Sequence, residues 1–119
     1  MIYGVVGVVI WTDNLELLRR FYRDTLRIPL HSDHGNFVAF HFGDMRFNIG
    51  QHDQVQGQAR EPYRIMINLG VSDIHAEHRR LAEQRVEFIR PPEQEEWGGW
   101  VATFKDPDGN LLQLLQMSE

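Results

Sequence analysis

An internal repeat is the feature of this sequence that most restricts its fold. Asp13 and Asp73, 60 residues apart, each stand between an apolar run and a pattern typical of a helix. Tyr3 and Tyr63 are also 60 residues apart, and later in the two halves Phe37-Val38-Ala39 matches Trp100-Val101-Ala102 and Asn48 matches Gln113. Because a repeated unit leaves open an apolar face that its copy can cover, we expect two similar modules.

Hydrophobic spacing predicts the elements of each module. Residues 5–11 are apolar and largely β-branched, which indicates a strand covered on both faces. Asp13 is the expected N-cap of a helix over residues 14–26, with Glu16 at its third position. Further strands are predicted at 30–32, 37–42 and 46–49. In the second half, strands are predicted at 64–71, 86–89, 100–104 and 111–115, a helix at 74–85, and an exposed acidic loop at 91–96.

The predicted elements make each half a βαβββ module, one at about 1–52 and the other at 62–117, within a single domain of residues 1–119. Residues 53–61 are polar and Gln-rich, which predicts a linker between the modules. One module has a four-stranded sheet with a helix on one face and a concave face uncovered. We therefore expect an α+β fold, a cupped eight-stranded mixed sheet with the helices outside and a cavity between the modules.

Composition excludes several classes of protein. A net charge of -5 argues against a nucleic-acid partner, because phosphate contacts need clustered Lys and Arg. No apolar run approaches the roughly 20 residues of a membrane span, and the first nine residues lack the basic region of a secretory signal. The chain has no Cys, which excludes disulfides and Cys-based zinc sites. We expect a cytoplasmic protein that contacts neither membranes nor nucleic acid.

Five short motifs are distributed along nearly the whole chain. They are Thr12-Asp13, Phe21-Tyr22-Arg23-Asp24-Thr25-Leu26, Val71-Ser72-Asp73-Ile74, Trp97-Gly98, and Asp106-Pro107-Asp108-Gly109-Asn110. With the repeat, they resemble the vicinal oxygen chelate superfamily, which includes glyoxalase I, extradiol dioxygenases, fosfomycin-resistance enzymes and bleomycin-binding proteins. Arg27 departs from that pattern, where Gly is usual, and so does the absence of Arg after Trp97-Gly98. The resemblance implies the fold expected above and a homodimer.

Enzymes of that superfamily hold one divalent cation on inward positions of the first and last strands of the modules. The resemblance maps these positions onto Val6, Met66, Asn48 and Gln113. Two apolar side chains and two neutral amides do not make a site for a hard cation. We therefore expect neither a metal nor another cofactor, with a divalent metal as the alternative.

Alternation along the strands predicts the lining of the cavity. Val6, Val8 and Ile10 are expected to point inward, as are Phe37, Ala39 and His41. The candidate ligand-binding residues are Phe37, His41, Arg46, Asn48, Arg64, Met66, Asn68, Trp97, Trp100 and Gln113. The alternative is that these aromatic residues fill the core and that His41 is a structural histidine. The other histidines are expected on exposed surfaces.

No catalytic constellation emerges, since the chain has no phosphate loop, nucleophile elbow or His-Glu-x-x-His motif. By resemblance to the bleomycin-resistance branch, we expect a metal-free protein that sequesters a small aromatic or amphipathic molecule and so confers antibiotic resistance. The net charge is compatible with a cationic ligand. The alternatives are a metal-dependent lyase, isomerase or dioxygenase, and a non-catalytic regulatory or partner domain whose cavity is closed by side chains.

Overall fold

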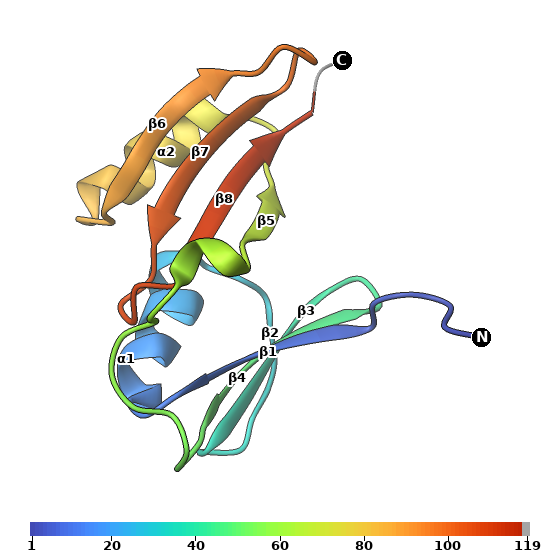
Figure 1. Cartoon of the computed structure of the whole chain (residues 1–119), viewed down its shortest axis with the longest axis vertical. Coiled ribbons are helices and arrows are strands. Elements are labelled where there is room, and N and C mark those ends of the chain that lie inside the picture. Colours follow the sequence, from blue (N-terminus) through green and yellow to red (C-terminus); the bar gives the residue numbers. More distant parts are fainter. Residues whose placement is uncertain (118–119) are drawn as a thin grey trace. The chain divides into compact units, whose positions relative to one another are not determined.

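The computed structural model describes residues 1–117 and divides the chain after Gly57 into two units. The first unit contains β1 (Gly7–Thr12), α1 (Leu15–Arg19), a π-helical turn η1 (Arg20–Thr25), β2 (Leu30–Asp33), β3 (Phe37–Phe42) and β4 (Met45–Gln51). The second contains a 3-10 turn η2 (Pro62–Arg64), β5 (Ile67–Gly70), α2 (Ile74–Glu83), β6 (Phe88–Gln94), β7 (Trp100–Lys105) and β8 (Leu111–Gln116). Both units are therefore βαβββ (Figure 1).

The two sheets have the same topology. Their strand orders are β1-β4-β3-β2 and β5-β8-β7-β6, and in each the first strand runs parallel to the last while the other pairs are antiparallel. Two four-stranded mixed sheets with one helix each confirm the fold that the repeat predicted. Within residues 1–117, no helix has the length and hydropathy needed to cross a bilayer.

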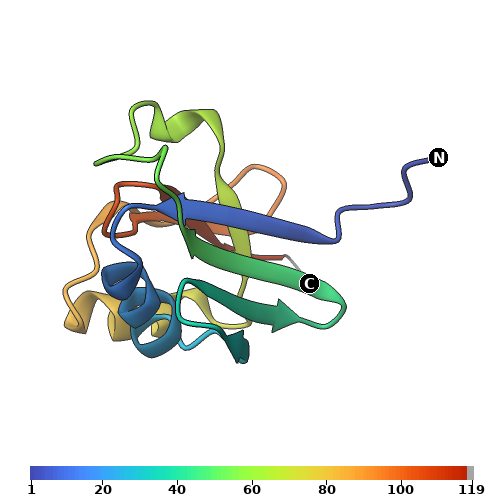
Figure 2. The ribbon, with the colours of Figure 1, turned by 90° about the horizontal axis from the view of Figure 1, so that it is seen from below.

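In the first unit, α1 and η1 cover one face of the sheet (Figure 2). The ring of Tyr22 lies 5.3 Å from that of Phe47, and both side chains are buried. Leu18, Phe40 and Ile49 are also fully buried and complete this core. In the second unit, α2 takes the same place, with Ile74 and Leu81 buried against Phe104, Leu112 and Leu114 of the sheet.

In each unit, a glutamine side chain at the end of the last strand accepts a hydrogen bond from the first residue of the helix. The Oε1 atom of Gln51 accepts a hydrogen bond from the N–H of Leu15 at 3.0 Å. In the second unit, Oε1 of Gln116 accepts from the N–H of Ile74 at 2.8 Å. These N–H groups lie in the first turn of a helix and have no partner within it, so each glutamine ties a helix to its sheet.

The N-cap predicted for the first helix was wrong by one residue. Asn14 is the cap, and its side chain accepts from the N–H of Leu17, whereas the Asp13 carboxylate accepts from the N–H of Gly57 at 2.9 Å. Asp73 caps α2 as predicted, through the N–H of Ala76 at 3.1 Å. The structural repeat in this region therefore relates Asn14 to Asp73, a shift of one residue from the sequence match.

Other boundaries also differ from the predictions. The helix predicted over 14–26 is an α-helix only to Arg19 and continues as a π-helical turn. The strand predicted over 64–71 covers only Ile67–Gly70. Part of the predicted acidic loop belongs to β6, which runs through Pro91-Pro92 to Gln94. An edge strand tolerates proline because one side of its ladder is unpaired, and β6 has two irregular steps in its register with β7.

The turn between β7 and β8 is held by one carboxylate. Asp106 is buried and accepts hydrogen bonds from the N–H groups of Asp108 and Asn110, both at 2.9 Å, and from the Asn110 amide. Gly109 has a φ of 81°, a conformation that favours glycine. The N–H of Ala59 donates to the carbonyl of Asp108, so the segment that leads into the second unit is tied to this turn.

Candidate functional site

Each sheet has one face turned away from its helix, and the strand register defines which residues form it. In the first unit, Phe47 faces η1, so its neighbours along β4 face the other way. Pairing across β1, β4 and β3 then arranges this face, here called the open face, in three rows. The rows are Gly7–Arg46–His41, Val9–Asn48–Ala39 and Trp11–Gly50–Phe37.

The last row is an aromatic pair that closes over a glycine. The rings of Trp11 and Phe37 lie 5.7 Å apart, on either side of Gly50. A Cβ atom at Gly50 would lie 2.5 Å from Cζ3 of Trp11 and 2.8 Å from Cδ1 of Phe37. Only glycine at this position lets both rings lie over the strand.

A hollow of about 520 Å³ adjoins this aromatic pair. It is lined by Trp11, Asn36, Phe37, Gln51, His52 and Asp53. The His52 ring meets Trp11 edge-on, with the ring centroids 5.1 Å apart. Trp11 is still 42% exposed, so its ring presents an apolar surface next to an imidazole. Such a surface suits a flat apolar group.

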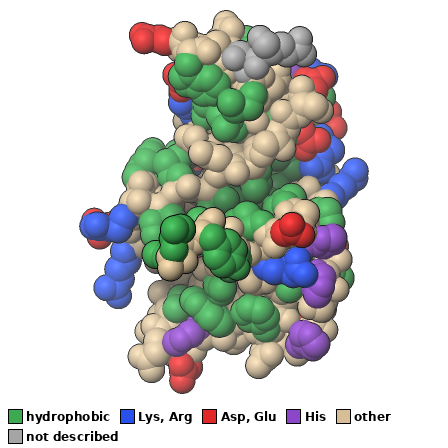
Figure 3. All heavy atoms as spheres, turned by 90° about the vertical axis from the view of Figure 1, so that its right-hand side faces the viewer, with side chains coloured by type: hydrophobic (Ala, Val, Ile, Leu, Met, Phe, Trp, Pro, Cys, Tyr) green, Lys and Arg blue, Asp and Glu red, His purple; other side chains and the backbone are tan. Residues whose placement is uncertain are grey.

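The first row of the open face is cationic. His41 is paired with Arg46 across β3 and β4, and the His31 ring lies 5.8 Å from that of His41. Gly7, the partner of Arg46 on β1, adds no side chain there. In the part of the chain that the structure describes, Arg46 forms no ion pair. Figure 3 shows histidine and hydrophobic side chains at the surface of the molecule.

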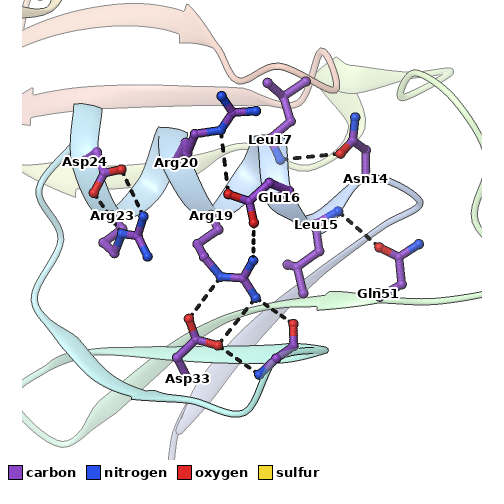
Figure 4. A network of polar contacts seen from close by, with 11 residues as sticks. Asn14, Leu15, Glu16, Leu17, Arg19, Arg20, Arg23, Asp24, Asp33 and Gln51 are labelled. Atoms are coloured by element: carbon purple, nitrogen blue, oxygen red, sulfur yellow. Dashed lines mark hydrogen bonds and ion pairs between the residues drawn. The ribbon is translucent and has the colours of Figure 1, made fainter.

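Several other arginines of the chain pair with carboxylates. Arg90 binds Glu93, and its Nη2 donates to Glu95 at 2.8 Å; these two bonds raise the pKa of the guanidinium. Arg19 donates to Asp33 at 3.0 Å, to Glu16 at 2.6 Å and to the carbonyl of Gly35 at 2.6 Å (Figure 4). This network fixes α1 to β2 on the side opposite the open face.

The open face of the second unit has a different chemistry. Its central row is Asn68–Gln113–Thr103, in which Nε2 of Gln113 donates to Oγ1 of Thr103 at 3.2 Å. The row equivalent to the aromatic pair is Gly70–Leu115–Val101. A hollow of about 430 Å³ adjoins it and is lined by no aromatic side chain.

Seven of the predicted ligand-binding residues lie on or next to these two faces. Phe37, His41, Arg46 and Asn48 share the open face of the first unit, and Asn68 and Gln113 are neighbours in the second. Met66 comes directly before β5, so alternation places it with Asn68.

The predicted orientations of Trp100 and of the first strand were wrong. Trp100, a predicted ligand-binding residue, does not lie on the open face, because its ring packs 4.8 Å from that of His75 on the helix side of the sheet. Val8 and Ile10 pair with Phe47 and Ile49 and so face the helix, and Val6 precedes the strand. The remaining two candidates lie outside the strands: Arg64 ends η2 and bonds Glu61, and Trp97 covers Gly99 in the β6–β7 turn.

Sequence reasoning missed Trp11, Gly50, His52, His31 and Gly7. The first strand is apolar from Val8 to Trp11, so no polar residue indicates which side chains face the helix. An error of one residue in assigning these side chains exchanges the two faces of the strand. His31 reaches the open face because the register of β2 with β3 shifts between Leu30 and Ser32.

Comparison with known proteins identifies the family. The family model described as "Glyoxalase-like domain" matches residues 5–118. The chain belongs to this family. The glyoxalase-like chain is similar to a solved member of the glyoxalase/bleomycin resistance protein/dioxygenase superfamily from Sphaerobacter thermophilus, with 26% identity, a TM-score of 0.78, and coverage of 98% of both chains.

Two curated relatives of the glyoxalase-like chain match over part of their length. An uncharacterized protein of Shewanella frigidimarina is 35% identical over 69 residues, which are 58% of this chain and 49% of that protein. The chain thus spans about half the length of this relative. A bleomycin resistance protein of Klebsiella pneumoniae is 57% identical over 28 residues, which are 24% of this chain and 22% of that protein.

The metal positions implied by the superfamily do not fit a hard cation in this member. Asn48 and Gln113 are amides, and the Gln113 amide also binds Thr103. The resemblance places the first-strand ligand seven residues before the helix cap. Because the cap is Asn14, this position is Gly7 and not Val6, which removes a side chain from the set. Residues 1–117 hold no group of three or more His, Cys, Asp or Glu arranged for a metal.

Proposed function

We propose that this chain is a binding protein that holds a small aromatic or amphipathic molecule without a metal, in the manner of sequestration or resistance proteins. The observation that carries the proposal is the Trp11–Phe37 pair held over Gly50, with Trp11 partly exposed beside a hollow. Aromatic rings gain free energy by stacking on such a surface.

The polar side chain in the row next to the aromatic pair suits binding. Asn48 is a neutral amide, which orients a ligand through hydrogen bonds and does not transfer protons. The comparison with a bleomycin resistance protein supports sequestration, although it covers a short segment. A homodimer in the cytoplasm remains part of the proposal.

Ligand-induced thermal stabilisation tests the proposal. We expect members of a panel of aromatic antibiotics and metabolites to raise the Tm of the wild-type protein. A ligand at a concentration of about 100 times its Kd should raise the unfolding free energy by about 2.7 kcal/mol. Trp11→Ala should weaken binding about 10-fold, and Phe37→Leu, a milder change, about 3-fold. Tyr63→Ala removes an exposed ring from the second unit and serves as the matched control. If Tyr63→Ala and Trp11→Ala weaken binding equally, the proposed surface is not the site.

Metal analysis tests the second part of the proposal. We expect protein purified without chelator to contain no stoichiometric divalent ion, and EDTA to leave its Tm unchanged. A bound ion lost from a Gln113→Leu variant would favour the alternative, a metal-dependent lyase, isomerase or dioxygenase.

A further inference from the structure

The first unit's open face is chemically graded from one end to the other. The aromatic row, which contains Gly50, lies at one end of the face. The cationic row, which contains Arg46, lies at the other end, four residues earlier on the same strand. At about 3.4 Å per residue the two ends are separated by about 14 Å. Between them lies the row of Val9, Asn48 and Ala39, which is mostly apolar.

We infer that this face takes an aryl carboxylate, with the ring on Trp11 and Phe37 and the carboxylate on Arg46. The inference rests on the proposed function and names the class of its ligand. Arginine suits the role because its planar fork binds a carboxylate through two parallel hydrogen bonds. The short alkyl chain of such a ligand would cross the central row beside the Asn48 amide.

The charge of Arg46 is available for a ligand. Gly7 leaves its β1 side free of a side chain, and His41 and His31 lie on its other side. The first unit's acidic residues are mostly engaged elsewhere. Glu16 and Asp33 bind Arg19, Asp24 binds Arg23, Asp13 accepts from Gly57, and Asp53 lies beside His52. Only Asp44, in the β3–β4 turn, is close along the chain and has no such partner among the described residues.

The net charge of the whole chain does not oppose an anionic ligand at this face. Residues 1–57 carry five Arg against six Asp and Glu, so the excess of negative charge lies mainly in the second half of the sequence. At the place equivalent to Arg46 the second unit has Leu111. Lys105, the equivalent of His41, lies 3.4 Å from Glu87. The cationic row is therefore a property of the first unit.

Two fluorescent probes with the same ring test the inference, pyrene-1-butyrate and its uncharged counterpart pyrene-1-butanol. We expect the acid to bind the wild-type protein about 10-fold more tightly than the alcohol at pH 7 and low salt. Arg46→Gln should abolish this preference, and Arg46→Lys should keep part of it because the charge remains without the fork. Arg79→Gln, an exposed arginine on α2, is the control and should keep the full preference.

The salt concentration adds an independent readout. Because salt screens the attraction between the Arg46 guanidinium and a carboxylate, the acid should bind severalfold more weakly at high salt than at low salt. The affinity of the alcohol should not fall.

The outcomes separate this inference from the proposed function. Equal binding of acid and alcohol, both weakened by Trp11→Ala, would overturn the inference and leave the proposed function standing. Binding of neither probe would overturn both. If the probes are displaced as protein concentration rises, and Arg46→Gln changes the oligomeric state, the occupant of this face is a second copy of the chain and the inference fails.

Discussion

Gly50→Ala tests whether the aromatic pair depends on a missing side chain. A new Cβ would lie 2.5 Å from the Trp11 ring and 2.8 Å from the Phe37 ring. Ordinary carbon contacts begin near 3.4 Å, so at least one ring must move by about 0.9 Å. Trp11 is the ring with room to move, because it is partly exposed.

The expected loss of stability follows from what that movement disrupts. Displacing Trp11 removes the Trp11–Phe37 contact, which is worth about 0.5–1.5 kcal/mol, and strains the surrounding packing by a similar amount. Alanine offsets about 0.4–1 kcal/mol of this by restricting the unfolded chain. We therefore expect Gly50→Ala to lower the unfolding free energy by about 1–2 kcal/mol, or roughly 4–8 °C in Tm.

Gly70→Ala is the matched control. Gly70 also lies in a strand on the open side of its sheet, yet a Cβ there meets no atom within 4 Å. The control should be neutral or more stable by up to about 1 kcal/mol. Chemical denaturation gives both free energies, and ¹⁹F NMR of 5-fluorotryptophan-labelled protein reports Trp11 directly. If both variants are equally stable and the Trp11 resonance does not shift, the Gly50 argument is wrong.

Three further results are expected from the fold. Gln51→Ala and Gln116→Ala should each lower the unfolding free energy by about 1 kcal/mol in urea titrations, because a helical N–H loses its acceptor, and Gln→Glu should retain most of it. Hydrogen bonds from the N–H of Gly35, and then from Arg19, lower the pKa of Asp33. The ionised Asp33 carboxylate therefore stabilises the fold above about pH 4, and this stabilisation is lost as the pH falls further. Asp33→Asn should flatten the acid limb of a curve of unfolding free energy against pH. Asp106→Ala should destabilise the protein by about 2–3 kcal/mol in the same titrations, because it leaves N–H groups of the β7–β8 turn without an acceptor, and Asp106→Asn should destabilise it less.

The repeat predicted the fold well because it depends on the order and type of elements. The apolar strands, the cap at Asp73 and the turn at Asp106 are local signals, and the structure follows them. Orientation within a strand depends on a register that changes sides at every residue, so an error of one position reverses a face. Phe37, Ala39 and His41 were placed on the face away from the helix because Val38, Phe40 and Phe42 form an apolar face suited to the core, and alternation puts the other three residues opposite.

Trp100 shows how such an error arises. The sequence match pairs Phe37-Val38-Ala39 with Trp100-Val101-Ala102. In the ladders, however, Asn48 lies opposite Ala39 and its counterpart Gln113 lies opposite Thr103. Phe37 therefore corresponds to Val101, and the apparent match is displaced by one residue. The displacement puts Trp100 on the helix side, against His75.

The corrected correspondence also explains why only one unit carries an aromatic surface. Trp11, Gly50 and Phe37 correspond in the second unit to Gly70, Leu115 and Val101. Aromatic rings flank a glycine in the first unit, whereas in the second the middle strand bears the large side chain and an outer strand bears the glycine. The same backbone pattern thus supports a ring-binding surface on one sheet and an aliphatic one on the other. The double variant Gly70→Trp with Leu115→Gly gives the second unit the equivalents of Trp11 and Gly50, and it should create a second ring-binding surface there. A pyrene titration that still shows one binding site would mean that these two positions are not sufficient.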